Sequence, residues 1–353
     1  MSNKHILFFL HGMGKHDNTW HEAGLKVLQS AWREYDNLKD LNFNELIEPV
    51  PLVYDDVFET WRQRMSADFA AFRTALLGGI APEDVPNTNN LKKQIDKIEG
   101  WIGAGEPNFI WSHAMDVVMY RFLTLMRVPV DVSVYKQIID KLAESSWTGW
   151  SIVAHSLGTS VAHNVLNTLY TTGLDGDPPF TTEQTRPQII MMVANVSRIL
   201  QRPGAKVYET PVHPGMSSIG AVCNYYLNVR HRLDPFTIPM AFDPDNWPSG
   251  ATYSKDKYQH IRPSHIHFEK DELFKVHDFD HYLKNPRVHA ALFRALAGKH
   301  SISDQELDDK KTEFDAAIVS STLKQARSKL ESKLPSVNSQ LDVYINLFKK
   351  IFS

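Results

Sequence analysis

Short apolar runs alternate with longer amphipathic stretches along this chain. The runs His5–Leu10, Ile152–Ala154 and Gln188–Ala194 are almost entirely apolar, which is typical of strands buried on both faces of a parallel sheet. Two less regular runs, Val50–Tyr54 and Gly220–Val229, predict further strands. The stretches between these runs repeat apolar residues with the spacing of a helix. This alternation predicts an α/β fold, with a mostly parallel central sheet flanked by helices.

Two segments stand apart from this alternation and suggest three parts. Residues 56–146 predict a helical cap inserted between two strands, and residues 301–353 predict a C-terminal helical extension broken at Pro335. The core domain is then expected from residues 1–55 and 147–300. The last helix is expected to pack on this core, with contact to a membrane surface or to another chain as the alternative. The main cap helices are expected at Trp61–Leu77, Phe109–Val128 and Val134–Ala143.

The region after residue 234 is interrupted by prolines. Pro235–Lys270 is predicted to be a long loop over one edge of the sheet. A last strand is expected within Ile266–Val276, and a helix is expected at Arg287–Leu296.

The most informative stretch reads W-S-I-V-A-H-S-L-G-T and covers residues 150–159. An apolar run ends at Ser156 and a helical pattern begins directly after it. Small residues, Ala154 and Gly158, lie two positions before and after the serine. A sharp turn there strains the serine backbone, and a larger side chain at either flanking position would collide with a neighbouring element. The stretch matches the nucleophile elbow G-x-S-x-G, with alanine in place of the first glycine. Ser156 is therefore the candidate nucleophile.

A second glycine turn, H-G-M-G-K at residues 11–15, leaves the first predicted strand. Its glycines allow the backbone to approach a bound carbonyl closely, so the N–H groups of Met13 and Leu157 are predicted to form an oxyanion hole. A phosphate-binding loop is excluded, because the spacing G-x-x-x-x-G-K-[ST] is absent.

Composition narrows the class of protein. The chain has 353 residues, of which 42% are hydrophobic and 22% charged, with a net charge of −3, as expected of a soluble globular protein. Nothing in this charge favours a nucleic-acid partner, and no apolar run is long enough for a transmembrane helix. No targeting segment is recognised. A single cysteine, Cys223, fits a reducing compartment, so a cytoplasmic location is expected.

Together these motifs resemble α/β-hydrolases of the lipase and carboxylesterase type. The resemblance spans residues 4 to about 297 and is carried by F-F-L-H-G-M-G-K-H, V-A-H-S-L-G-T-S-V-A, the Asp234–Pro235 junction, and H-Y-L-K-N-P-R-V from His281 onward. It implies the α/β-hydrolase fold, a small-molecule ester or lipid-like substrate, and no cofactor. The oligomeric state is left open. Alternatives are a thioesterase, amidase or peptidase that uses the same residues, or a non-catalytic binding protein that keeps the fold.

The resemblance also implies a triad in the order Ser, Asp, His. His281 is expected to accept the proton of Ser156, and Asp234 to orient the imidazole. His277 is the alternative base. His277 and His281 also have the spacing of metal ligands, but no H-E-x-x-H occurs and no metal site is predicted. His155 is expected to pack and hydrogen-bond rather than to act as a second base. Rival acids, each more typical of a turn, are Asp175, Asp243 and Asp245.

Overall fold

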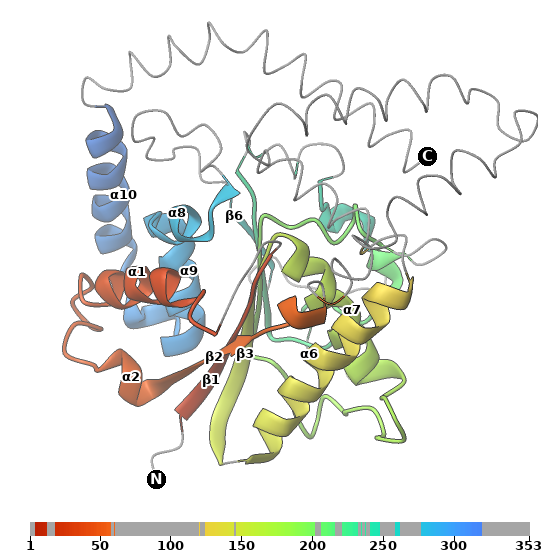
Figure 1. Cartoon of the computed structure of the whole chain (residues 1–353). Helices are drawn as coiled ribbons and strands as arrows, with labels where there is room; N and C mark the ends of the chain where they lie inside the picture. Colours follow the sequence, from red (N-terminus) through yellow and green to blue (C-terminus); the bar gives the residue numbers. More distant parts are fainter. Residues whose placement is uncertain are drawn as a thin grey trace, which may run out of the picture. The chain divides into compact units, whose positions relative to one another are not determined.

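A computed structural model gives the fold of the chain (Figure 1). It describes residues 4–12, 18–57, 60, 120, 124–144, 146–201, 206–215, 221–231, 234, 237, 241–247, 258–261 and 277–319. The chain divides into two compact units, one comprising residues 1–12, 16–53 and 131–353 and the other residues 13–15 and 54–130. Most of the second unit, and with it most of the predicted cap, lies outside the described residues.

The centre of the first unit is a sheet in which six described strands are all parallel, in the order β2-β1-β3-β4-β5-β6. This confirms the predicted α/β class with a parallel sheet. The inner strands are apolar at nearly every position and are buried on both faces, as covering by helices on both sides requires. The strands are β1 (Lys4–Leu10), β2 (Ile47–Leu52), β3 (Trp147–His155), β4 (Ile189–Val193), β5 (Tyr225–Val229) and β6 (Tyr258–Ile261).

The register brings the carboxyl ends of the strands to one edge. Leu10 pairs with Ala154, Val193 pairs with both His155 and Val229, and β6 ends opposite Val229. The segments that follow β1, β3 and β5 therefore leave the sheet at the same edge. Binding sites of open parallel sheets lie at this edge.

Helices cover both faces of the sheet. The helices α1 and α9 pack together on one face, where α9 contacts β4 and β5, and α7 lies on the other face (Figure 1). In the core between α1 and α9, the rings of Trp32 and Phe293 meet edge to face at 5.0 Å. The helices are α1 (Glu22–Trp32), α2 (Phe43–Leu46), α6 (Thr124–Glu144), α7 (Leu157–Thr171), α8 (Phe279–Leu283), α9 (Pro286–Ala297) and α10 (Asp304–Val319), with short 3₁₀ turns at Val207–Glu209, Pro244–Asn246 and Lys299–Ser301.

The order of the strands changes direction at β1: β2 lies on one side of β1, whereas β3 and the later strands follow on the other side. The helix that follows β1 is α1, and the helix that follows β3 is α7, on the opposite face. The two connections therefore diverge at the carboxyl edge. Such a switch point opens a crevice in parallel sheets, and here it is bordered by Gly12 after β1 and Ser156 after β3.

The strand β2 differs from its prediction. A regular strand was expected only from Val50, because prolines cannot donate to a sheet ladder, but β2 runs Ile47–Leu52 and contains Pro49 and Pro51. It pairs with β1 and forms an edge of the sheet. Proline is tolerated in an edge strand, because its missing N–H can lie on the side that has no partner.

The strand β6, which lies last in the order of the described strands, corrects a second prediction. β6 (Tyr258–Ile261) lies within the segment that was predicted to be a loop, Pro235–Lys270. It has only four residues, of which Tyr258 and Ile261 are buried while Gln259 and His260 between them are exposed or partly exposed, so it lacks the continuous apolar run of a central strand. The strand predicted within Ile266–Val276 lies outside the described residues.

Two helices bear on the predicted cap and extension. Separate helices were expected to end at Val128 and begin at Val134, but α6 is continuous through Pro129.

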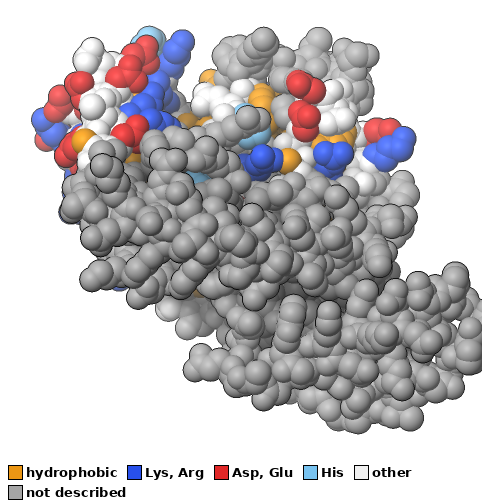
Figure 2. Space-filling view, turned by 90° about the horizontal axis from the view of Figure 1, so that it is seen from above, with side chains coloured by type: hydrophobic (Ala, Val, Ile, Leu, Met, Phe, Trp, Pro, Cys, Tyr) orange, Lys and Arg blue, Asp and Glu red, His pale blue; other side chains and the backbone are white. Residues whose placement is uncertain are grey.

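In the extension, α10 packs on α9, where Arg287 pairs with both carboxylate oxygens of Asp315 at 3.0 and 2.7 Å. Residues 320–353, which include the second predicted helix, lie outside the described part. Figure 2 shows acidic and basic side chains interspersed in the group at its upper left.

Within the described ranges, no helix combines the length and the apolar character needed to cross a bilayer.

Candidate active site

The turn between β3 and α7 holds Ser156 in a strained backbone conformation, as predicted. Its φ is 53° and its ψ is −126°, a combination unfavourable for a residue with a Cβ. The Ser156 N–H donates to the Val193 carbonyl on β4 at 3.0 Å. The Thr159 hydroxyl donates to the Ser156 carbonyl at 2.6 Å and accepts the Val196 N–H at 3.0 Å. These bonds fix the turn from both the sheet and the helix.

Glycines allow the neighbouring elements to approach this turn. A Cβ on Gly158 would lie 2.7 Å from the Leu10 carbonyl oxygen and closer still to that of His11, and both of these are backbone atoms. A Cβ on Gly12 would lie 2.7 Å from Ser156 Cβ. The collision predicted for residue 158 is therefore confirmed, and α7 can begin against the end of β1 only because that position lacks a side chain.

Three buried side chains form one hydrogen-bonded row at the carboxyl edge. His277 Nε2 lies 2.7 Å from Ser156 Oγ, and His277 Nδ1 lies 2.8 Å from Asp234 Oδ2. The exposed fractions of Ser156, His277 and Asp234 are 2%, 3% and 0%. The serine follows β3, the aspartate follows β5, and the histidine precedes α8. Residues from three distant parts of the sequence thus meet at one edge of the sheet.

The histidine in this row is His277, not the expected His281. His281 lies within α8 and is only partly buried, whereas His277 precedes the helix and is turned inward. His281 instead lies beside Asp278 and Asp280. One side-chain nitrogen or oxygen atom from each of these three residues lies within 4.8 Å of the other two. Ser156 and Asp234 are brought together as expected. The assignment of the base must therefore be corrected to His277, which the sequence left as the alternative.

A residue to which the sequence assigned no role completes the row at its acidic end. The Tyr282 hydroxyl donates to Asp234 Oδ2 at 2.7 Å and accepts the backbone N–H of His231 at 3.1 Å. Burial, and then the nearby Asp234 carboxylate, raise the pKa of Tyr282 well above its ordinary value. The phenol therefore keeps its proton and acts as a donor. Its only sequence signal was its place in the stretch H-Y-L-K-N-P.

His155 links the strand that carries the serine to the segment that carries the histidine. Its Nε2–H donates to the backbone carbonyl of His277 at 2.6 Å. Its ring centroid lies 4.9 Å from that of His277 and 5.5 Å from that of Phe279. The expected packing and hydrogen-bonding role of His155 is therefore confirmed.

Of the two predicted oxyanion donors, one falls within the described residues. Leu157 is the first residue of α7 and directly follows the serine. An amide at the first helical position has no acceptor within the helix and points along the positive end of the helix dipole. Met13 lies outside the described residues.

The rival acids lie elsewhere on the surface. Asp175, Asp243 and Asp245 are all exposed. Asp175 has a positive φ of 54° beside Gly176, and Asp243 accepts the N–H of Asp245 at 3.1 Å in a short 3₁₀ turn. Each of them forms a turn, as expected.

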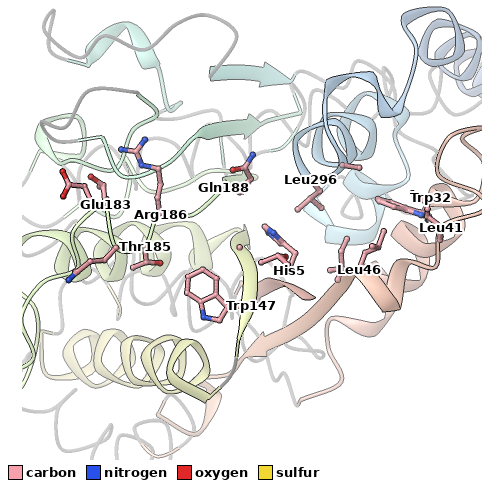
Figure 3. Close-up of a pocket in the computed structure, with 16 residues that line it drawn as sticks. His5, Trp32, Leu41, Leu46, Trp147, Glu183, Thr185, Arg186, Gln188 and Leu296 are labelled. Carbon is pink, nitrogen blue, oxygen red and sulfur yellow. Dashed lines mark hydrogen bonds between the residues drawn. The ribbon is translucent and has the colours of Figure 1, made fainter. Parts of the chain in front are cut away.

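A cavity of about 640 Å³ lies at the other end of the sheet. It is lined by residues at the amino ends of β1 and β3, among them His5 and Trp147, with Leu296 and Trp32 to one side and Arg186 to the other (Figure 3). His5 Nε2 lies 2.8 Å from Ser151 Oγ, and burial lowers the pKa of His5 to about 4. None of the residues of the Ser156 row lines this cavity.

The Ser156 row has the order needed for proton transfer. A carboxylate bonded to Nδ1–H holds the imidazole in the tautomer whose Nε2 lone pair faces the serine hydroxyl. Nε2 can then accept the serine proton as the oxygen attacks an electrophile, and the buried carboxylate stabilises the resulting imidazolium. A scan of protein-family models found none that matches this chain, and a search of curated proteins found no match.

Proposed function

We propose that this chain is a serine hydrolase of the α/β-hydrolase type, which cleaves carboxylic esters through an acyl-enzyme on Ser156. The unbroken row of Ser156, His277 and Asp234, with contacts of 2.7 and 2.8 Å, is the observation that carries the proposal. Two further features support it. The serine backbone is strained, and the row lies at the carboxyl edge of a parallel sheet, where such sheets bind ligands.

In the first half of the proposed reaction, His277 accepts the proton of Ser156 while Oγ attacks the ester carbonyl. His277 then returns the proton to the leaving alcohol, which leaves an acyl group on Oγ. In the second half, His277 takes a proton from water as the water oxygen attacks the acyl carbonyl. His277 then returns this proton to Oγ, the bond between Oγ and the acyl carbon breaks, and the carboxylic acid leaves. The Leu157 N–H, and Met13 as the expected second donor, stabilise the negative oxygen of both tetrahedral intermediates. One such donor contributes about 3–4 kcal/mol to transition-state stabilisation.

The helical cap over residues 56–146 and the extension over 301–353 belong to the same proposal, as does a small ester or lipid-like substrate. A cytoplasmic location is also part of it, because a chain with one cysteine forms no internal disulfide.

Hydrolysis of p-nitrophenyl esters of increasing acyl length tests the proposal. We expect Ser156→Ala to lower kcat by about 10⁴-fold or more, because the nucleophile is lost. Ser160→Ala is the matched control, since Ser160 is also buried in α7 but lies outside the row. A thioester and an anilide of the same acyl group determine whether esters are preferred. Full activity of Ser156→Ala would refute the proposal.

A further inference from the structure

The hydroxyl of Tyr282 shares its acceptor with the histidine of the row. Asp234 Oδ2 accepts both the His277 Nδ1–H at 2.8 Å and the Tyr282 O–H at 2.7 Å. The hydroxyl oxygen in turn accepts the His231 N–H at 3.1 Å. The row therefore continues past the aspartate and ends on a backbone amide. Asp234 is fully buried and Tyr282 is 2% exposed, so water does not replace this donor.

From this geometry we infer that Tyr282 is a positioning residue: its hydroxyl holds the Asp234 carboxylate in place and withdraws charge from the oxygen that orients His277. The inference rests on the proposed function, because it assigns to Tyr282 a part in the same row. The hydroxyl of Tyr282 bonds to Asp234 and to the His231 N–H, so the proposed effect on His277 passes through Asp234.

The fold joins the base and the tyrosine in one short piece of chain. His277 lies two residues before α8, and Tyr282 is the fourth residue of that five-residue helix. After the helix, Asn285 begins α9, where its side chain accepts the Arg287 N–H at 3.0 Å. Both donors to Asp234 Oδ2 therefore come from a segment that is fixed at its far end by α9. If this segment shifted, both bonds would change together.

Sharing the acceptor has a consequence for proton transfer. A hydroxyl bond to Oδ2 draws negative charge away from the side that faces the imidazole, so the carboxylate stabilises the imidazolium less. The described groups that the structure shows against His277 include Ser156, Asp234 and His155, and the charge of Arg230, directly after β5, acts at Tyr282. Of these, only Asp234 bonds directly to Tyr282. Without the hydroxyl, His277 should hold its proton up to a higher pH and act as a base over a narrower range.

The pH dependence of ester hydrolysis by Tyr282→Phe tests this inference. This change removes one oxygen and keeps the ring. We expect the acidic limb of kcat/KM to move to higher pH by roughly 0.5–1 unit, since the net free energy of a typical protein hydrogen bond corresponds to a shift of about that size. At the optimum, kcat should fall about 3- to 10-fold with little change in KM. The control is Tyr35→Phe, which removes another buried hydroxyl, bonded to His289 Nε2 at 2.8 Å.

A histidine titration followed by NMR separates this inference from the proposed function. With labelled histidine, the His277 signal is identified by its loss in His277→Asn, and its titration is compared among wild type, Tyr282→Phe and Tyr35→Phe. A higher midpoint in Tyr282→Phe alone supports the inference, even if no ester is cleaved and the proposed function fails. An unchanged midpoint, or an equal shift in Tyr35→Phe, would overturn the inference while leaving ester hydrolysis untouched.

Discussion

Ser156 adopts a backbone conformation that costs about 1–3 kcal/mol, and its surroundings show how the fold retains it. Its N–H and its carbonyl are both bonded, to Val193 and to Thr159 respectively. Ala154, in the position usually held by glycine, is completely buried, so a methyl group is accommodated there. The elbow thus tolerates one added carbon before the serine. A methyl group at position 158, two residues after the serine, is not accommodated, because the backbone carbonyls of Leu10 and His11 occupy that space.

Gly158→Ala should therefore damage both the stability and the reactivity of the protein. The added methyl would overlap the carbonyls of Leu10 and His11, and such overpacking typically costs 1–3 kcal/mol. We expect urea unfolding to show a loss of about this size, and ester hydrolysis to fall sharply because α7 must move away from β1. In Gly176→Ala the methyl meets nothing within 4 Å, so that variant should keep its activity. A fully stable and active Gly158→Ala would contradict this account of the elbow.

At the scale of single residues, the structure brings Ser156 and Asp234 into one row, as the sequence predicted, but joins them through His277 rather than the predicted His281. A serine between small residues has a local signature, and an aspartate after a strand is placed by the sheet itself. His277 and His281 are only four residues apart, and which one turns inward depends on the packing of α8. Phe279 sets that packing, with its ring 5.8 Å from Trp20 and against Gly24 of α1, and such long-range contacts leave no local pattern.

Among the elements, the helices on the two faces of the sheet each bury a histidine in its neutral form. His163 lies on α7, and burial lowers its pKa to about 3. His289 lies on α9, and burial lowers its pKa to about 4. His289 bonds to Tyr35 and to the Leu283 carbonyl, and His163 bonds to Thr210. The surroundings of both helices therefore resist protonation of an imidazole.

The stability of the fold should fall as the pH drops below about 6.5. The unfolded chain takes up a proton at each of these histidines near pH 6.5, while the folded chain does not until pH 4 or below, so acid favours unfolding. Between pH 7.5 and 5, each histidine should contribute a loss of roughly 2 kcal/mol in the free energy of unfolding. Urea unfolding at the two pH values measures this loss.

His289→Gln should reduce the total loss by roughly 2 kcal/mol, because this site no longer titrates while the other buried histidines, His5 among them, still do. His300→Gln is the control, since His300 is exposed and should leave the loss unchanged. Equal losses in all three proteins would show that these buried histidines do not control acid stability.

The sequence predicted the central strands well and the edges poorly. β1, β3 and β4 lie where the apolar runs are, because burial on both faces leaves a continuous signal. The strands β2 and β6, which lie at the two ends of the sheet among the described residues, lack that signal, and β2 also contains prolines. Two helices were predicted, one ending at Val128 and one beginning at Val134, where α6 is continuous through Pro129; proline disfavours a helix interior without forbidding it.

For the molecule as a whole, the two ends of the sheet have different properties. The carboxyl edge, at the switch between β1 and β3, carries the Ser156 row and its anchors His155 and Tyr282. The amino edge carries a cavity with an apolar and a polar side, into which none of these residues projects. Chemistry is therefore expected at the carboxyl edge. A ligand bound at the amino edge could influence that chemistry only through the sheet that separates the two edges.

The most direct test is to map the adduct of a fluorophosphonate, which reacts with activated serines, by mass spectrometry. We expect wild type and His281→Asn to carry it on Ser156, while His277→Asn and Ser156→Ala carry none at matched times. Labelling of His277→Asn at the wild-type rate, or loss of labelling in His281→Asn but not in His277→Asn, would contradict the proposed row.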